Sequence, residues 1–207
     1  PVRLPKVIAK HQVSAALAAA AVGIALRVNP VQIVDALAAF GPLPGRMRLV
    51  PGTKGSILLD DTYNASPAST VAALAALGEL QASRKIAILG DMLEIGEDSV
   101  KKHRELAEPV VLSGAKQVVL VGHGMKYLFD ELIERFGFSR QQVFWFERSG
   151  EAASFAEDMA QEGDLILVKG SQGIRMERVS EKLLFDPVEA PYFLCRQSLE
   201  WKAKSSE

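Results

Sequence analysis

The sequence is poor in the residues that build disulfides and metal sites. Its 207 residues include a single cysteine, Cys195, and three histidines, His11, His103 and His123. One thiol excludes an intrachain disulfide and a zinc site of several cysteines, and it fits the reducing cytosol. The histidines show no spacing typical of metal ligands. We therefore expect a cytoplasmic protein with no metal site of its own.

Long hydrophobic runs and a strong net charge are also absent. The longest apolar stretch, residues 13–26, is mostly alanine and is too short and too weakly hydrophobic to span a bilayer. The net charge of −1 creates no global field that would attract nucleic acid or an anionic membrane. We expect a monomer that binds neither. Because the chain begins at Pro1, with residues typical of the middle of a fold, we interpret it as a piece of a longer protein.

The common signatures of phosphoryl and acyl chemistry are missing as well. There is no Gly-x-x-x-x-Gly-Lys-Ser/Thr phosphate loop and no Gly-x-Gly-x-x-Gly fingerprint. No Ser/His/Asp or Cys/His constellation stands out. The chain could hold a nucleotide or a small substrate, but it lacks the residues that activate a phosphoryl group. We therefore assign no catalytic residue within it.

The sequence divides into a short helical part and a longer α/β part. An alanine-rich helix is expected over residues 12–28, and Asn29-Pro30 is typical of the start of a second helix. The segment GPLPG at residues 41–45 cannot continue a helix, so it marks the best domain boundary. Beyond it, residues 47–50 and 56–61 are typical of a hairpin.

After the hairpin, apolar strands alternate with helices. The expected strands are residues 85–89, 117–121, 143–146 and 164–168, and the expected helices are residues 67–83, 99–112, 125–136, 151–161 and 176–184. Apolar strands separated by helices indicate an α/β fold with a mostly parallel sheet and helices on both faces. The polar tail from Lys202 is expected to be disordered.

The most informative stretch is residues 60–67, DDTYNASP, which follows the apolar run of the hairpin's second strand. Ser66 can cap the next helix and Pro67 suits its first position. In open α/β sheets, ligands bind beyond the carboxyl ends of the strands. Two acids crowded there with a hydroxyl, a phenol and an amide therefore favour a site, although an ordinary turn would use the same residue types.

Three later strands are also followed by glycine-rich loops. These are residues 90–96 (GDMLEIG), 122–124 (GHG) and 169–173 (KGSQG), the last followed closely by Arg175. Glycine permits positive φ and exposes backbone N–H groups that suit anions. Each loop alone is weak evidence, but together they line one edge of the sheet and favour a ligand cleft.

Three segments, in this order along the chain, resemble motifs of one family: residues 60–67, residues 85–96 (KIAILGDMLEIG) and residues 168–177 (VKGSQGIRME). Together they resemble the Mur ligases of the MurF type, which add D-alanyl-D-alanine to UDP-N-acetylmuramoyl-tripeptide. The family has a domain for the UDP-sugar peptide, a central ATPase domain and a Rossmann-like C-terminal domain. The resemblance implies that residues 1–45 are the end of the ATPase domain with its hinge, and residues 46–207 the C-terminal domain.

The resemblance also implies roles for particular residues. Arg46 and Asp61 match positions that contact the ribose of the nucleotide, and Asn64 could contact the adenine or support the turn. His11 matches the histidine of a His-Asn-x-x-Asn segment, but Gln12 and Ala15 replace its asparagines, which puts its nucleotide contacts in doubt. The resemblance also implies a second set of residues that face the incoming amino substrate: Lys169, Gly170, Ser171 and Arg175.

The implied reaction uses ATP, with Mg²⁺ offsetting the charge of the triphosphate, to turn the carboxylate of the precursor into an acyl phosphate that the amine of D-alanyl-D-alanine attacks. The fragment alone is expected to be inactive.

The nearest alternative to a MurF-type chain is another amide ligase, such as the diamino-acid-adding Mur ligase or a folylpolyglutamate synthetase. A flavodoxin-like binding or receiver module with Asp60, Asp61 and Lys169 in an acidic pocket is a second alternative, and a haloacid-type phosphatase is disfavoured because Thr62 breaks its Asp-x-Asp spacing.

Overall fold

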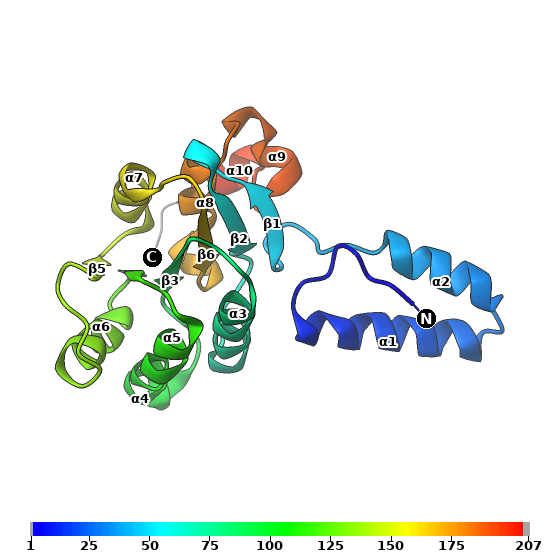
Figure 1. Ribbon diagram of the computed structural model, residues 1–207, viewed down its shortest axis with the longest axis horizontal. Coiled ribbons are helices and arrows are strands. Elements are labelled where there is room, and N and C mark those ends of the chain that lie inside the picture. Colours follow the sequence, from blue (N-terminus) through cyan, green and yellow to red (C-terminus); the bar gives the residue numbers. More distant parts are fainter. Residues whose placement is uncertain (1, 205–207) are drawn as a thin grey trace. The chain divides into compact units, whose positions relative to one another are not determined.

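The computed structural model describes residues 2–204, except for the side chain of His11. The chain forms two compact units that divide between Leu43 and Pro44 (Figure 1). The division falls inside the GPLPG segment, whose prolines and glycines interrupt helical hydrogen bonding. Each unit is described by itself.

The N-terminal unit is a helical hairpin. Helix α1 spans Lys10–Ala25 and helix α2 spans Pro30–Ala39. The side chain of Asn29 accepts a hydrogen bond from the backbone N–H of Val31 at 2.9 Å, so the predicted cap starts α2. The helices approach closely at Gly23, where a Cβ atom would lie 2.9 Å from Cδ1 of Ile33. Gly23 therefore allows α1 to pack closely against α2 at this point.

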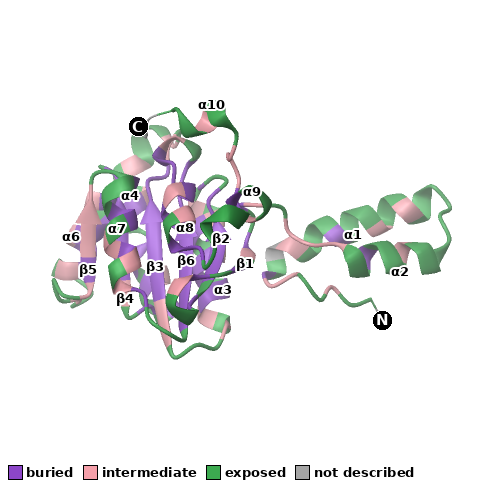
Figure 2. Cartoon of the chain, turned by 90° about the horizontal axis from the view of Figure 1, so that it is seen from above, coloured by how far each residue is buried: buried purple, intermediate pink, exposed green. Residues whose placement is uncertain are grey.

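The C-terminal unit is built on a six-stranded sheet with the order β1-β2-β6-β3-β4-β5. The strands are β1 Arg48–Pro51, β2 Ile57–Asp61, β3 Arg84–Gly90, β4 Gln117–Val121, β5 Val143–Phe146 and β6 Asp164–Lys169. Strand β1 pairs antiparallel with β2, and the other neighbours pair in parallel. The predicted hairpin and mostly parallel sheet are confirmed. Figure 2 shows the central strands as the most buried part of this unit.

Helices cover both faces of this sheet, as predicted. The helices are α3 Pro67–Glu79, α4 Ser99–Arg104, α5 Ala107–Ser113, α6 Met125–Glu134, α7 Ser149–Met159, α8 Glu177–Leu183, α9 Ala190–Phe193 and α10 Leu199–Lys202, with short 3-10 turns at Thr53–Gly55, Gly96–Asp98, Gln172–Ile174 and Pro187–Glu189. Figure 1 shows α3 to α6 on one face and α7 with α8 on the other. Buried apolar side chains of α7 and α8 form one cluster with alternate residues of the strands. The sheet is therefore the middle of three layers.

Two sequence-based expectations about helices were wrong. The single helix expected over residues 99–112 is broken between α4 and α5, because Pro109 in α5 would place its ring against the carbonyl of Glu105 in a continuous helix. The tail expected to be disordered from Lys202 contains the end of α10, which the side chain of Ser198 caps by accepting from the N–H of Trp201 at 3.4 Å. Residues 205–207 of that tail lie outside the described residues.

Candidate functional site

The carboxyl ends of β2, β3, β4 and β6 meet at one edge of the sheet, and their loops are joined by backbone hydrogen bonds. The N–H of Ser171 after β6 donates to the carbonyl of Asp91 after β3 at 2.9 Å. The N–H of Asp91 donates to the carbonyl of Val121 at the end of β4 at 3.0 Å. Polar side chains on these loops are thereby held in fixed positions at this edge.

Asp61 and Lys169 form an ion pair between the carboxyl ends of β2 and β6. The two residues are direct neighbours in the register of β2 and β6, and their charged atoms lie 2.6 Å apart. Lys169 is only 2% exposed and also donates to the carbonyl of Asn64 at 2.8 Å. The other carboxylate oxygen of Asp61 accepts from the N–H of Met47 at 3.1 Å. The pair therefore ties β2 to β6 and to the start of the C-terminal unit.

Asp60 points to the opposite face of the sheet, because successive side chains of a strand alternate. Its carboxylate is fully buried and accepts from the hydroxyl of Ser180 in α8 at 2.8 Å, from Thr62 at 2.9 Å and from the N–H of Gly45 at 2.9 Å. Burial raises the pKa of Asp60 from its ordinary 3.8 to about 6, against the lowering effect of those three hydrogen bonds. The expectation that both carboxylates crowd into one site was therefore wrong, since Asp60 anchors α8.

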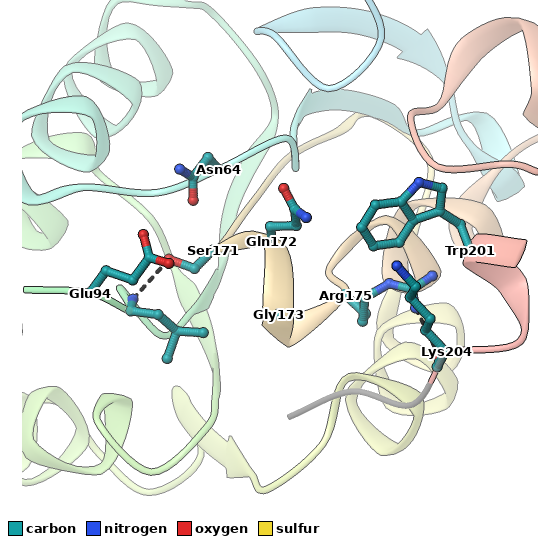
Figure 3. A pocket seen from close by; sticks show the side chains of 9 residues that line it. Asn64, Glu94, Ser171, Gln172, Gly173, Arg175, Trp201 and Lys204 are labelled. Carbon is teal, nitrogen blue, oxygen red and sulfur yellow. Dashed lines mark hydrogen bonds between the residues drawn. The ribbon is translucent and has the colours of Figure 1, made fainter.

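A cavity of about 560 Å³ opens beside these loops. Its lining residues are Asn64, Leu93, Glu94, Ser171, Gln172, Gly173, Arg175, Trp201 and Lys204. Figure 3 shows polar side chains from the loops after β2, β3 and β6 around it, together with Trp201 and Lys204 from the end of the chain. The volume lies within the range of small-molecule sites, ~300–1,000 Å³.

Three of the residues predicted from the sequence line this cavity. The hydroxyl of Ser171 accepts from the N–H of Leu93 at 2.8 Å and donates to the carbonyl of Ala65 at 3.2 Å, so it joins three loops. The side chain of Asn64 accepts from the N–H of Ala65 at 2.9 Å and shapes the turn. Arg175, in a left-handed conformation with φ 61°, forms an ion pair with Glu177 at 2.5 Å.

Other predicted residues are set back from the cavity. Asp61 and Lys169 are paired with each other. Gly170 lies against the end of β3, since a Cβ atom there would lie 3.0 Å from Cα of Gly90 and 2.5 Å from Cγ of Met176. Arg46 is exposed and stacks on the ring of Tyr63, with 3.9 Å between the guanidinium carbon and the ring centroid. None of these four residues is among those that line the cavity.

His11 lies in α1, within the N-terminal unit. The structure describes its backbone but not its side chain. Its predicted nucleotide contact stays a prediction.

The loop GHG at residues 122–124 leads into α6 and does not line the cavity. The carboxylate of Asp91 accepts from the N–H groups of Gly124 at 2.9 Å and Met125 at 2.6 Å, and so caps α6. At Gly122, which has φ 103°, a Cβ atom would lie 2.5 Å from Cγ of Asp91. Close approach of this carboxylate explains why the loop needs glycine.

Sequence reasoning missed the residues that close the cavity from the C-terminal side. Trp201 and Lys204 carry no motif, and only the fold brings them to the cavity. Arg196 carries no motif either, and it pairs with Glu177, the last residue of the motif at residues 168–177 and the ion-pair partner of Arg175. Glu94 lies in a loop that the sequence did single out, as a glycine-bracketed acidic loop.

No group of three or more His, Cys, Asp or Glu side chains in residues 2–204 is arranged to hold a metal ion. None of the described helices is long and apolar enough to cross a membrane.

A family model described as "Mur ligase, glutamate ligase domain" matches residues 45–172. This chain belongs to the Mur ligase family. Family membership excludes the stand-alone receiver and phosphatase alternatives. The model covers the sheet and the loops of the site, as far as the loop after β6.

Curated relatives of this Mur ligase chain are named UDP-N-acetylmuramoyl-tripeptide–D-alanyl-D-alanine ligases. The protein from Rickettsia prowazekii is 34% identical over 135 residues, which are 65% of this chain and 29% of that protein. The protein from Escherichia coli K12 is 30% identical over 185 residues, which are 84% of this chain and 37% of that protein. The chain thus spans well under half the length of these relatives.

Solved structures of MurF proteins have the same fold as this chain. MurF from Acinetobacter baumannii superposes with a TM-score of 0.76 at 28% identity, covering 88% of this chain and 39% of that one. MurF from Thermotoga maritima, solved in complex with ADP, superposes with a TM-score of 0.64 at 25% identity, covering 83% of this chain and 37% of that one. The α/β fold predicted for a MurF-type C-terminal domain is confirmed.

The raised pKa of Asp60 predicts how stability varies with pH. Because its pKa is higher in the folded state than in the unfolded chain, the folded state binds the proton more tightly. The Asp60 contribution to the free energy of unfolding therefore falls by about 3 kcal/mol as pH rises from ~4 to ~6, and stays low above that. In Asp60→Asn, the free energy of unfolding should change less over this pH range, as measured by urea unfolding at several pH values. Asp130→Asn, in a partly exposed pair with Lys126, should leave the slope in place. An unchanged slope in Asp60→Asn would show that this carboxylate does not titrate there.

The buried pair predicts strong coupling between Asp61 and Lys169. Asp61→Asn and Lys169→Met should each lower the free energy of unfolding by about 3–5 kcal/mol, because each leaves an uncompensated buried charge. The double variant should lose much less than the sum, as measured by urea unfolding of all four proteins. The partly exposed pair Lys126–Asp130 serves as the control cycle and should couple by less than about 1 kcal/mol. Additive losses at the buried pair would contradict the ion-pair assignment.

Proposed function

We propose that this chain is the C-terminal part of an ATP-dependent amide ligase that adds D-alanyl-D-alanine to UDP-N-acetylmuramoyl-tripeptide in peptidoglycan synthesis. The observation that carries the proposal is the cavity at the carboxyl edge of the sheet, which is of small-molecule size and lined by Asn64, Ser171 and Arg175. The names of the relatives from R. prowazekii and E. coli support it. The proposed enzyme is a cytoplasmic monomer that binds neither nucleic acid nor membrane.

In this proposal, residues 1–45 end the central ATPase domain and form the hinge, and residues 46–207 are the C-terminal domain. The division of the chain between Leu43 and Pro44 supports this assignment, as does its coverage of only 37% of the E. coli relative. Since the chain has no phosphate loop, we expect no ligation by the chain alone.

ATP and Mg²⁺ are the proposed cofactors. ATP supplies the phosphoryl group that makes the carboxylate of the precursor a better electrophile, and Mg²⁺ offsets the charge of the triphosphate. The residues of this chain proposed to face the nucleotide are Arg46, Asp61, Asn64 and His11. Arg46 fits this role because its guanidinium is exposed on the ring of Tyr63. Asp61 fits this role because it is a carboxylate at the carboxyl edge of the sheet, next to Asn64 through their shared partner Lys169, and a carboxylate accepts hydrogen bonds from hydroxyl groups.

The proposed role of the loop after β6 is to position the dipeptide. Ser171 and Arg175 line the cavity, while Lys169 and Gly170 hold the base of the loop against β2 and β3. A dipeptide bound there reacts from a fixed position, and in such reactions small displacements cost much of the rate. The named substrate residues thus divide into two that face the cavity and two that support it.

The nucleotide assignment predicts a specific kinetic change at Arg46. In the full-length ligase that contains this chain, Arg46→Ala should raise KM for ATP about tenfold, because it removes a charged hydrogen-bond donor. Steady-state kinetics with ATP varied would measure it. Arg48→Ala is the matched control, since Arg48 donates to the carbonyl of Tyr192 and should not affect ATP. Equal effects of the two variants on KM for ATP would contradict the assignment.

The dipeptide assignment predicts a selective loss at Ser171. Ser171→Ala should lower kcat/KM for D-alanyl-D-alanine roughly tenfold, because two hydrogen bonds that hold the cavity loops are lost, and should leave KM for the UDP precursor unchanged. Ser113→Ala removes a similarly buried hydroxyl at the end of α5, which donates to the carbonyl of Val110 and accepts from the N–H of Ala115, so it controls for general destabilisation. A loss shared by both substrates would assign Ser171 to structure alone.

A further inference from the structure

The cavity described above carries opposite charges at opposite ends. Figure 3 shows Glu94 on one side and Arg175 with Lys204 on the other, with Asn64 and Gln172 between them. The loops after β3 and β6 supply the acidic and basic residues, respectively, and the end of the chain adds Lys204. A site of this kind attracts a small molecule that has one charge of each sign.

The basic end has an excess of positive charge. Arg175 and Arg196 share one carboxylate, that of Glu177, at 2.5 Å and 3.2 Å. All three side chains are nearly buried, so their charges are poorly screened by water. The ammonium of Lys204 lies 3.9 Å from the ring centroid of Trp201 and has no carboxylate partner among the described residues. This end therefore favours an anionic group.

The acidic end is held in an unusual backbone conformation. Glu94 has φ 62°, a left-handed conformation that is strained for a residue with a Cβ atom. The preceding N–H, of Leu93, is fixed on the hydroxyl of Ser171. Within residues 2–204 the carboxylate of Glu94 has no cationic partner in an ion pair, although it lines the cavity. Strained residues that hold an unpaired charge in a cavity are typical of binding sites.

The segment around α10 forms a fixed wall of the cavity. The carbonyl of Lys204 accepts from Arg175 at 2.8 Å and also from Arg178, and Lys202 pairs with Glu181 of α8 at 2.8 Å. These contacts place the ring of Trp201 against the cavity, 5.4 Å from the guanidinium carbon of Arg175. An aromatic face beside two charged ends suits small apolar side chains of a ligand.

We propose that the cavity binds D-alanyl-D-alanine as a zwitterion, with its ammonium at Glu94, its carboxylate at Arg175 and Lys204, and its methyl groups against Trp201. This inference rests on the proposed function and adds the orientation of the dipeptide. It also makes Glu94, Trp201 and Lys204 specificity-determining residues. Ser171 then acts as a positioning residue, because it holds the Glu94 loop.

The test uses the 207-residue chain, which contains the whole cavity, and three probes. They are D-alanyl-D-alanine, its C-terminal amide, which lacks the anionic charge, and its N-acetyl derivative, which lacks the cationic charge. Binding is followed by the fluorescence of Trp201, with Trp201→Phe showing which part of the signal comes from Trp145. The free dipeptide should bind about tenfold more tightly than either derivative, because each derivative loses one charged contact. Succinate, which has two anionic groups, should bind more weakly than the dipeptide.

Two charge-neutralising variants separate the ends of the cavity. Glu94→Gln should weaken dipeptide binding about tenfold and remove the preference over the N-acetyl derivative, while Lys204→Gln should remove the preference over the amide. Glu97→Gln and Lys101→Gln, which change exposed charges outside this cavity, are the matched controls and should behave as wild type.

The same variants in the full-length ligase give a second readout. There Glu94→Gln and Lys204→Gln should raise KM for D-alanyl-D-alanine about tenfold and leave KM for ATP unchanged. If both variants keep the wild-type preference among the probes and the wild-type KM for the dipeptide, or if succinate binds as tightly as the dipeptide, the inference is wrong. If the wild-type full-length enzyme does not ligate the dipeptide at all, it is the proposed function that fails.

Discussion

The buried ion pair between Asp61 and Lys169 is the constraint on which the site depends. It joins the ends of β2 and β6 in register, and through Met47 and Asn64 it also holds the segments on either side of β2. A charge buried to this extent is tolerated only when its partner is in place. The loops beyond these strands therefore start from fixed points, and the residues that they carry reach the cavity in defined positions.

Above this pair, backbone contacts determine where each loop runs. Gly170 meets β3 so closely that a side chain would not fit, and the N–H of Ser171 bonds to the carbonyl of Asp91. The hydroxyl of Ser171 then holds the N–H of Leu93, next to Glu94. The acidic end of the cavity is thus coupled to the loop after β6. Its basic end is built separately, from the charges shared around Glu177.

Much of the fold could be predicted because it follows from local patterns. Apolar runs predict the strands, and Ser66 caps α3 as its position before Pro67 suggests. The motifs also pointed to Asn64, Ser171 and Arg175, which follow strands whose carboxyl ends must meet. Trp201 and Lys204 could not be found in this way, because tertiary contacts alone bring the end of the chain to the cavity. The motif grouped Asp60 and Asp61 in one site, but side chains alternate along β2, so Asp60 bonds to Ser180 of α8 while Asp61 pairs with Lys169.

The central claim is that the cavity between the loops after β2, β3 and β6 and the segment around α10 holds the dipeptide. Nuclear magnetic resonance of the ¹⁵N-labelled chain, titrated with D-alanyl-D-alanine, tests it most directly. The account predicts that the largest shifts fall on the backbone amides of Glu94, Gln172 and Gly173 and on the indole N–H of Trp201. Shifts concentrated instead in the groove between α4 and α6, around Lys101 and Arg135, or spread evenly over the chain, would contradict it.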